Sequence, residues 1–136
     1  MLAKVFSGAG LGLNRRFIEV KVDKRSSKAH FIIMGLPDAA VQESRMRVRS
    51  AVRNRGMSLT AGSYTVNLAP ADIYKRGPAY DLPIAVGVLA ATAQIPHDEL
   101  EQTMFIGELV GKDNIAPSHI AEAIQYRPRK NEFWMV

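Results

Sequence analysis

The stretch Tyr64–Ile95 constrains the fold of this chain more than any other part. It begins with apolar residues at every second position as far as Leu68, which is the pattern of a half-buried β-strand. It ends with the apolar run Leu82–Ala93, which only Pro83 and Thr92 interrupt. Because a helix that is apolar on every side must be buried on every side, this run predicts a central core helix.

The segment between that strand and that helix, Ala69–Asp81, has the composition of a functional loop. It contains two prolines, one glycine and four charged residues, namely Asp72, Lys75, Arg76 and Asp81. Loops at strand ends often carry functional groups, since the rigid elements around them hold those groups in place. A carboxylate also accepts hydrogen bonds from the free amides at a helix start, so we expect Asp81 to cap the core helix.

Four further segments have the composition of strands. Apolar and charged side chains alternate along Phe17–Asp23, as on a strand with one wet face. The predicted strands are Leu2–Phe6, Phe17–Asp23, His30–Leu36, Thr103–Leu109 and the one that begins at Tyr64. With helices over Pro37–Arg55 and Leu82–Gln94, the sequence predicts a mixed α/β (α+β) domain, in which one sheet of about five strands is covered by helices.

The predicted helix Pro37–Arg55 carries a stripe of positive charge. Arg45, Arg49 and Arg53 follow one another at intervals of four along one flank, with no acidic residue between them. In one interpretation the stripe binds a polyanion. In the other, the arginine stems cover apolar surface while the charged heads stay in water.

The net charge of +5 is unevenly distributed. Residues 1–62 contain 12 Lys and Arg against 4 Asp and Glu, whereas residues 63–136 contain 6 against 9. Such asymmetry indicates either an acidic partner for the first half, usually nucleic acid, or a solvated basic face. If the partner is DNA, the candidate contacts are Arg45, Arg49 and Arg53, extended by Lys75 and Arg76 if the fold brings the loop near.

Composition argues against several other kinds of site. Without cysteine there is no disulfide, thiol nucleophile or cysteine zinc site. The histidines His30, His97 and His119 have no second ligand three or four residues away, so we expect no metal site.

No apolar run reaches the roughly 20 residues that span a bilayer, and no signal-peptide pattern opens the chain. We therefore expect a soluble, cytoplasmic protein without a membrane partner.

No nucleotide-binding motif is complete. The closest approach to a P-loop, Gly107–Asp113, is one residue too short and ends on a carboxylate that would repel phosphate. The glycine cluster Gly8–Gly12 has Leu13 where a dinucleotide fingerprint needs its last glycine. We expect tight-turn glycines over Ser7–Gly12, no ATP site and no cofactor.

Four long motifs in order resemble a known family. They are MLAKVFSGAGLGL at the start, MGLPDAAVQESRMRVRSAVRNRG at Met34–Gly56, VNLAPADIYKRGPAYDLPIAVGVLAATAQI at Val66–Ile95, and MFIGEL at Met104–Leu109. Together they are similar to the N-terminal (ChlI-type) domain of the ComM/YifB proteins, which are magnesium-chelatase-like AAA+ ATPases. The proteolytic domain of Lon is a more distant likeness. The resemblance implies a Lon-domain-like (ribosomal-protein-domain-like) topology and, for the intact family protein, a hexamer that acts on DNA in branch migration and competence.

The tail has a different resemblance. GKDNIAPSHIAEAIQYRPRKNEFWMV is similar to the extreme C-terminus of the same family, and the Walker motifs that the family carries in between are absent. The resemblance thus divides the chain into a Lon-like N-terminal domain, residues 1–109, and a junction with a C-terminal helix, residues 110–136. An engineered deletion and an internally deleted gene would each explain such a junction near Val110–Asp113.

Three functions follow as hypotheses. The first is a non-catalytic accessory domain of a DNA-processing AAA+ motor, with the AAA+ module of the intact family protein as its partner. The second is a stand-alone module that binds nucleic acid weakly and without sequence preference. The third is a Lon-like serine–lysine peptidase, but Ala79 follows Gly77-Pro78 where that family has its serine. Tyr80 would be a weak substitute, because an ordinary phenol has a pKa near ~10.

Overall fold

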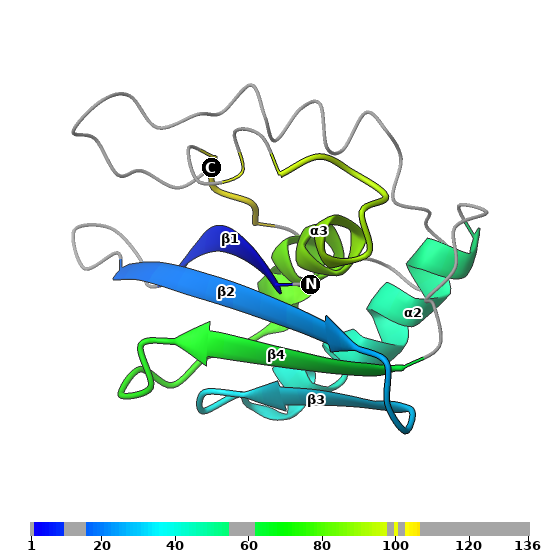
Figure 1. Cartoon of the computed structure of the whole chain (residues 1–136). Helices are drawn as coiled ribbons and strands as arrows, with labels where there is room; N and C mark the ends of the chain where they lie inside the picture. Colours follow the sequence, from blue (N-terminus) through cyan, green and yellow to red (C-terminus); the bar gives the residue numbers. More distant parts are fainter. Residues whose placement is uncertain (1, 10–15, 55–61, 98–99, 101–102, 107–136) are drawn as a thin grey trace.

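One mixed sheet forms the centre of the molecule (Figure 1). The computed structural model describes residues 2–9, 16–54, 62–97, 100 and 103–106. Within them the strands are β1 (Leu2–Ala9), β2 (Arg16–Arg25), β3 (His30–Met34) and β4 (Ser63–Ala69). Their order is β1-β2-β4-β3; β2 is antiparallel to β1 and β4, whereas β3 is parallel to β4. The predicted fold class, a mixed α/β domain built on a single sheet, is confirmed.

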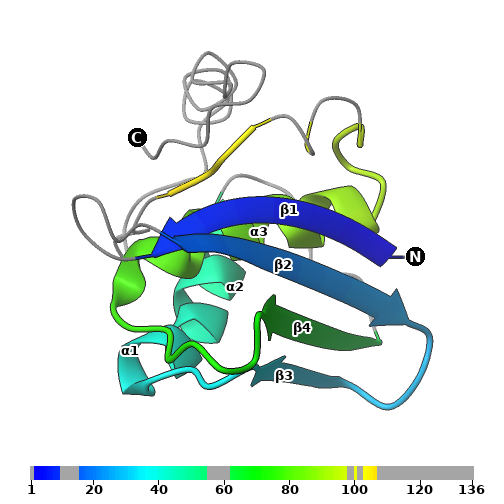
Figure 2. The ribbon, with the colours of Figure 1, turned by 90° about the vertical axis from the view of Figure 1, so that its left-hand side faces the viewer.

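Helices cover one face of this sheet (Figures 1 and 2). They are α1 (Ala39–Gln42), α2 (Ser44–Asn54), the short 3-10 helix η2 (Pro78–Tyr80) and α3 (Asp81–Ala91). Alternation along the strands decides which face they cover. On β2, for example, Ile18, Val20 and Val22 are fully buried, while the charged residues between them lie on the outer face.

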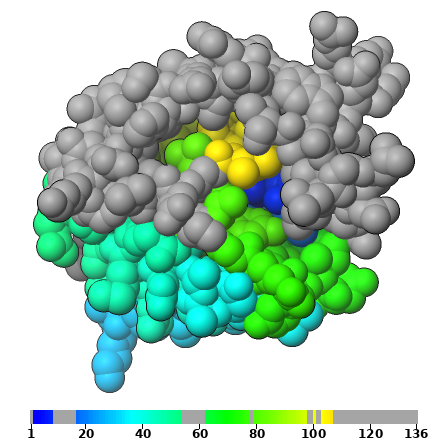
Figure 3. All heavy atoms as spheres, turned by 180° about the vertical axis from the view of Figure 1, so that it is seen from behind, coloured from blue at the N-terminus to red at the C-terminus, as the bar shows by residue number. Residues whose placement is uncertain are grey.

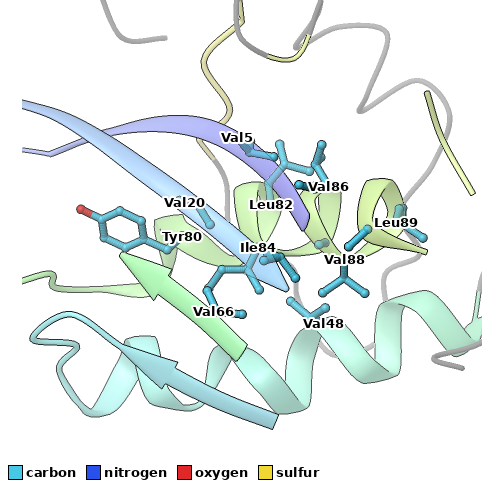
Figure 4. Packing of buried hydrophobic residues seen from close by; sticks show 14 of the residues in the cluster. Val5, Val20, Val48, Val66, Tyr80, Leu82, Ile84, Val86, Val88 and Leu89 are labelled. Carbon is cyan, nitrogen blue, oxygen red and sulfur yellow. The ribbon is translucent and has the colours of Figure 1, made fainter. Parts of the chain in front are cut away.

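The core helix and its strand form as the sequence predicts. All residues of α3 are buried, and on β4 Val66 and Leu68 are fully buried. Figure 4 shows Ile84 of α3 and Val48 of α2 with Val66 in one apolar cluster. The helix ends earlier than the predicted Gln94, because Ala93 has a left-handed backbone with φ of 58°.

The absence of a side chain at Gly87 brings α3 close to the sheet. A Cβ atom there would lie 2.5 Å from Cγ2 of Val22 on β2. The contact needs glycine for space, since the backbone of Gly87 is ordinary helix. Close packing of helix on sheet therefore depends on this one position.

The predicted helix Pro37–Arg55 is two helices, separated at Glu43. The buried residues of these two helices are Val41, Ser44, Val48, Ala51 and Val52. The break accompanies a tertiary contact, because the carbonyl of Ala40 accepts a hydrogen bond from Nη2 of Arg47 at 2.7 Å. The predicted end at Arg55 lies outside the described residues.

Strand bounds differ from the prediction at several ends. β1 runs on to Ala9, so the first residues of the expected glycine turn are strand, and residues 10–15 lie outside the described part. β3 ends at Met34 because Gly35 and Leu36 have φ values of 104° and 57°. Of the predicted strand Thr103–Leu109, Met104 forms a parallel bridge with Phe6 on β1, and residues 107–109 are not described. The Lon-like topology and the boundary at residue 109 stay predictions.

Candidate nucleic-acid interface

The loop between β4 and α3 is held against the loop between β3 and α1. Lys75 donates its backbone N–H to the carbonyl of Leu36 at 2.8 Å and accepts from the N–H of Asp38 at 2.9 Å. The carboxylate of Asp38 caps α1 through the N–H of Val41 at 2.8 Å and accepts from the N–H of Gly77 at 3.0 Å. Backbone and side-chain bonds therefore fix the middle of the β4–α3 loop to the start of α1.

Lys75 is a correction to the sequence-based candidates, because its side chain is completely buried. Its ammonium donates a hydrogen bond to the carbonyl of Pro70 inside the same loop. Burial lowers the pKa of Lys75, an effect that the nearby charge of Asp72 opposes. A buried ammonium with a backbone partner cannot extend an exposed phosphate-binding surface, so Lys75 stabilises the loop instead.

Tyr74 and Arg76, the residues on either side of Lys75, are exposed. The guanidinium of Arg76 lies 5.1 Å from the centroid of the Tyr74 ring. Tyr74 is 50% exposed. The sequence-based candidates do not include Tyr74; an aromatic side chain among charged loop residues is the signal that could have identified it.

The three arginines of the stripe lie on the outer side of α2. Arg45, Arg49 and Arg53 are all exposed, whereas the opposite side of the helix is buried on the core. Within the described part of the chain, no acidic side chain forms an ion pair with any of the three. The blue-green surface of α2 and the green surface of the β4–α3 loop lie on one face of the molecule, with the cyan surface around α1 between them (Figure 3). The surface of α2 and that of the loop to which Arg76 belongs are therefore seen on the same side of the molecule.

Asp81 does not cap α3, which corrects a second expectation. The N-cap of α3 is Tyr80, without a side-chain cap bond, and Asp81 is fully buried in the first turn. Its carboxylate instead accepts from the hydroxyl of Ser44 and from Nε of Arg47 at 2.6 Å. Because Asp81 is fully buried, its carboxylate needs partners inside the protein, and Ser44 and Arg47 of α2 provide them.

Comparison with known proteins assigns the chain to a family. Residues 18–136 match the family described as ChlI, subunit ChlI of Mg-chelatase. The chain belongs to this family. It is 43% identical over 108 residues to the competence protein ComM of Haemophilus influenzae, and 44% identical over 108 residues to the uncharacterized protein YifB of Salmonella typhimurium. These matches cover 79% of this chain and 21% of each relative.

A more distant relative covers slightly more of the chain. An uncharacterized protein of Mycobacterium tuberculosis is 40% identical over 116 residues, which is 85% of this chain and 23% of that protein. The chain therefore spans about a fifth of the length of the curated relatives it matches. The ChlI match continues through Val110–Asp113, where the sequence predicts a junction, and the division of the chain there stays a prediction.

Ala79 stands where the sequence resemblance to Lon would place a serine. Ala79 lies in η2 and has no side-chain oxygen. The phenol of the next residue, Tyr80, is 3% exposed, and burial together with the charge of Asp38 raises its pKa to about 12. A phenol that keeps its proton so tightly is a weaker nucleophile at neutral pH than an ordinary tyrosine.

Two of the three histidines, His30 and His97, lie in the described part of the chain. His30 is exposed at the start of β3, and Nε2 of His97 lies 2.9 Å from the carbonyl of Ala90. His119 is outside the described residues. In the described ranges, no three His, Cys, Asp or Glu side chains gather where a metal ion could be held, and no helix there has the length and apolarity to cross a membrane.

Proposed function

We propose that this chain is a non-catalytic accessory domain of a magnesium-chelatase-like AAA+ ATPase that acts on DNA. In this proposal Arg45, Arg49 and Arg53 bind DNA phosphates, and Arg76 extends the same surface. The ATPase module of the intact family protein is the partner that supplies ATP hydrolysis. The name of one relative, competence protein ComM, favours DNA as the polyanion.

The observation that carries the proposal is the contrast among the four arginines at positions 45–53 of α2. Arg47 points into the protein, where it binds Asp81 and the carbonyl of Ala40. The other three are exposed and have no acidic partner within the described residues. A helix that buries one arginine and leaves three exposed in a row presents a fixed positive stripe rather than a general basic surface.

The anchoring of α2 makes the stripe suitable for binding. Val48, Ala51 and Val52 are buried on the core, and Arg47 ties the helix to the start of α3. Because the helix is fixed at both its apolar and its polar contacts, binding does not have to order its backbone, which lowers the entropic cost of the complex. Contacts from such a stripe are to phosphate, so they position the protein without reading sequence.

Three or four phosphate contacts give weak binding. Non-specific complexes of this kind have dissociation constants of about 10⁻⁴–10⁻⁶ M at physiological salt. In a ring of several copies, which the family resemblance implies, the contacts would act together and raise the effective affinity. An accessory role in a larger motor therefore fits the small number of charges better than a stand-alone role does.

The test is fluorescence anisotropy with a labelled duplex of about 30 base pairs at low salt, a length chosen to exceed the footprint of one domain. We expect the triple variant R45Q/R49Q/R53Q to lose at least about tenfold in affinity, because it removes three phosphate contacts. The matched control is K4Q/K21Q/R25Q, which removes the same charge from the outer face of the sheet, where these residues pair with Glu19 and Asp23.

Equal losses in both triple variants would mean that net charge alone governs binding and would contradict a specific role for α2. Sub-micromolar binding by the wild-type chain at physiological salt would instead favour the second candidate, a stand-alone nucleic-acid-binding module. Both variants change exposed or surface-paired side chains, so we expect their stability to stay within about 1 kcal/mol of wild type.

A further inference from the structure

Tyr74 and Arg76 form an exposed pair whose geometry the loop determines. They flank Lys75, which is buried and whose backbone is bonded on both sides to the β3–α1 loop. In an extended segment, alternate side chains point in opposite directions. Burial of Lys75 therefore turns Tyr74 and Arg76 outward together, and the guanidinium comes to lie 5.1 Å from the ring centroid.

The pair is held more firmly than an ordinary surface loop. The carboxylate of Asp38 binds the N–H of Gly77 directly after Arg76, and the ammonium of Lys75 binds the carbonyl of Pro70 before Tyr74. A ring that is 50% exposed on such a support is an aromatic surface already ordered before any ligand arrives. Pre-ordering of this kind reduces the entropic cost of binding a flat ligand.

We propose that Tyr74 and Arg76 form a stacking platform for an unpaired nucleobase. The Tyr74 ring would stack on the base, and the Arg76 guanidinium would pair with the adjoining phosphate or stack on the same base. This inference rests on the proposed function and adds to it the form of nucleic acid that this part of the surface takes. Bases of a duplex are stacked on one another and cannot reach the ring, so the platform selects single strands or frayed ends.

Charge favours a nucleic acid over a protein as the occupant. The surface of the β4–α3 loop, which contains Arg76, lies on the same face as the surface of α2, the helix that carries the arginine stripe (Figure 3). A single strand that stacks on Tyr74 would therefore have further positive charge available for its phosphates. The competing occupant is a protein, because Leu36, whose carbonyl binds Lys75, is 47% exposed and adds apolar surface to this region.

The test compares single-stranded and duplex oligonucleotides of equal length against wild type, Y74A, Y74F and Y74L in anisotropy at low salt. We expect Y74A to bind the single strand at least about fivefold more weakly, as loss of one stacking contact does, and to bind the duplex unchanged. Y74F should keep wild-type affinity because it keeps the ring. Y74L should behave like Y74A, since it keeps apolar area without an aromatic face.

A second measurement identifies the contact directly. A single strand that carries 5-iodouracil is irradiated with the wild-type chain, and the crosslinked peptide is sequenced by mass spectrometry. We expect the crosslink at Tyr74. Tyr64 and Tyr80 are buried and provide internal controls, since a crosslink at either would mean that the chain had unfolded.

The outcomes separate this inference from the proposed function. Wild-type binding that is unchanged in Y74A but lost in R45Q/R49Q/R53Q would overturn the platform and leave the phosphate-binding stripe in place. Loss of single-strand binding in Y74A alone would uphold the platform and contradict the stripe. Absence of any binding would overturn both. Y74A with unchanged affinity and a smaller sedimenting species would assign Tyr74 to contact between protein copies and would also overturn the platform.

Discussion

Arg47 and Asp81, which are 34 positions apart, form an ion pair with 2.6 Å between Nε and Oδ2. The Asp81 side chain is fully buried and that of Arg47 is 20% exposed. The guanidinium also reaches the carbonyl of Ala40, so one side chain of α2 connects α1, α2 and α3. This arrangement sets the orientation of the helix that carries the exposed arginines.

Removal of one partner of this pair should destabilise the fold strongly. We expect D81A to lower the free energy of unfolding by about 3–5 kcal/mol, because it leaves the Arg47 guanidinium largely buried without its carboxylate. The control is E43Q, which removes the exposed second partner of Arg47 at 3.6 Å and should cost about 1 kcal/mol or less. Urea denaturation measures both; similar small losses would show that the buried pair does not hold the helices together.

The close approach of Gly87 to Val22 leaves too little space for a larger side chain at this position of α3. G87A should destabilise the protein by about 1–3 kcal/mol through overpacking, although alanine is the better helix former by ~1 kcal/mol. The double variant G87A/V22A should recover part of the loss because it removes the methyl group that the new Cβ meets. Thermal unfolding of the two variants is the measurement. A G87A protein that is as stable as wild type would mean that α3 lies further from β2.

Tyr80 predicts a loss of stability in strong alkali. Its pKa is raised from 10.0 to about 12, so between these values the folded state holds a proton that the unfolded state has released. The proton that Tyr80 retains therefore stabilises the folded state. This stabilisation is complete below pH 10, disappears as pH rises through about 12, and amounts to roughly 2–3 kcal/mol. Urea unfolding of wild type and Y80F at pH 9, 10 and 11 tests this. The difference in free energy between them should change with pH, and a constant difference would contradict the raised pKa.

Lys75 and Arg76 are adjacent in sequence, but we expect only the substitution of Arg76 to weaken DNA binding. R76Q should weaken DNA binding at low salt by several-fold, because it removes one exposed phosphate contact. K75M should leave DNA affinity within about twofold of wild type, since its ammonium is buried against Pro70. Anisotropy on the same duplex, with circular dichroism to establish that K75M is folded, measures both. An equal loss in the two variants would show that Lys75 reaches the DNA.

The hydrophobic pattern of the sequence predicted those strands and helices whose burial it reflects directly. The sequence was sufficient to predict the strand at Tyr64, the strand over Phe17–Asp23 and the buried helix α3. A periodicity of two or an uninterrupted apolar run reflects burial directly. The exposed positions of Arg45, Arg49 and Arg53 follow from the same reasoning, since the opposite helix face is apolar.

Structural features that depend on residues far away in the sequence could not be predicted from it. The burial of Lys75 and the role of Asp81 each depend on contacts with residues far away in the sequence. Asp81 stood at the start of a helix, where capping is the ordinary role of a carboxylate, but its partners on α2 lie 34 and 37 positions away in sequence. A loop lysine is usually solvated, whereas Lys75 is held inside the protein by backbone bonds to Leu36 and Asp38 and by the bond of its ammonium to Pro70.

The proposed role of the three exposed arginines of α2 is to neutralise DNA phosphates. The most direct measurement is the slope of log K against log salt concentration for duplex binding, in wild type, R45Q/R49Q/R53Q and the outer-face control K4Q/K21Q/R25Q. Each phosphate contact contributes about 0.9 to the slope, so the stripe variant should have a slope smaller in magnitude by about 2.7, while the control keeps the wild-type slope. An unchanged slope in the stripe variant would contradict the account.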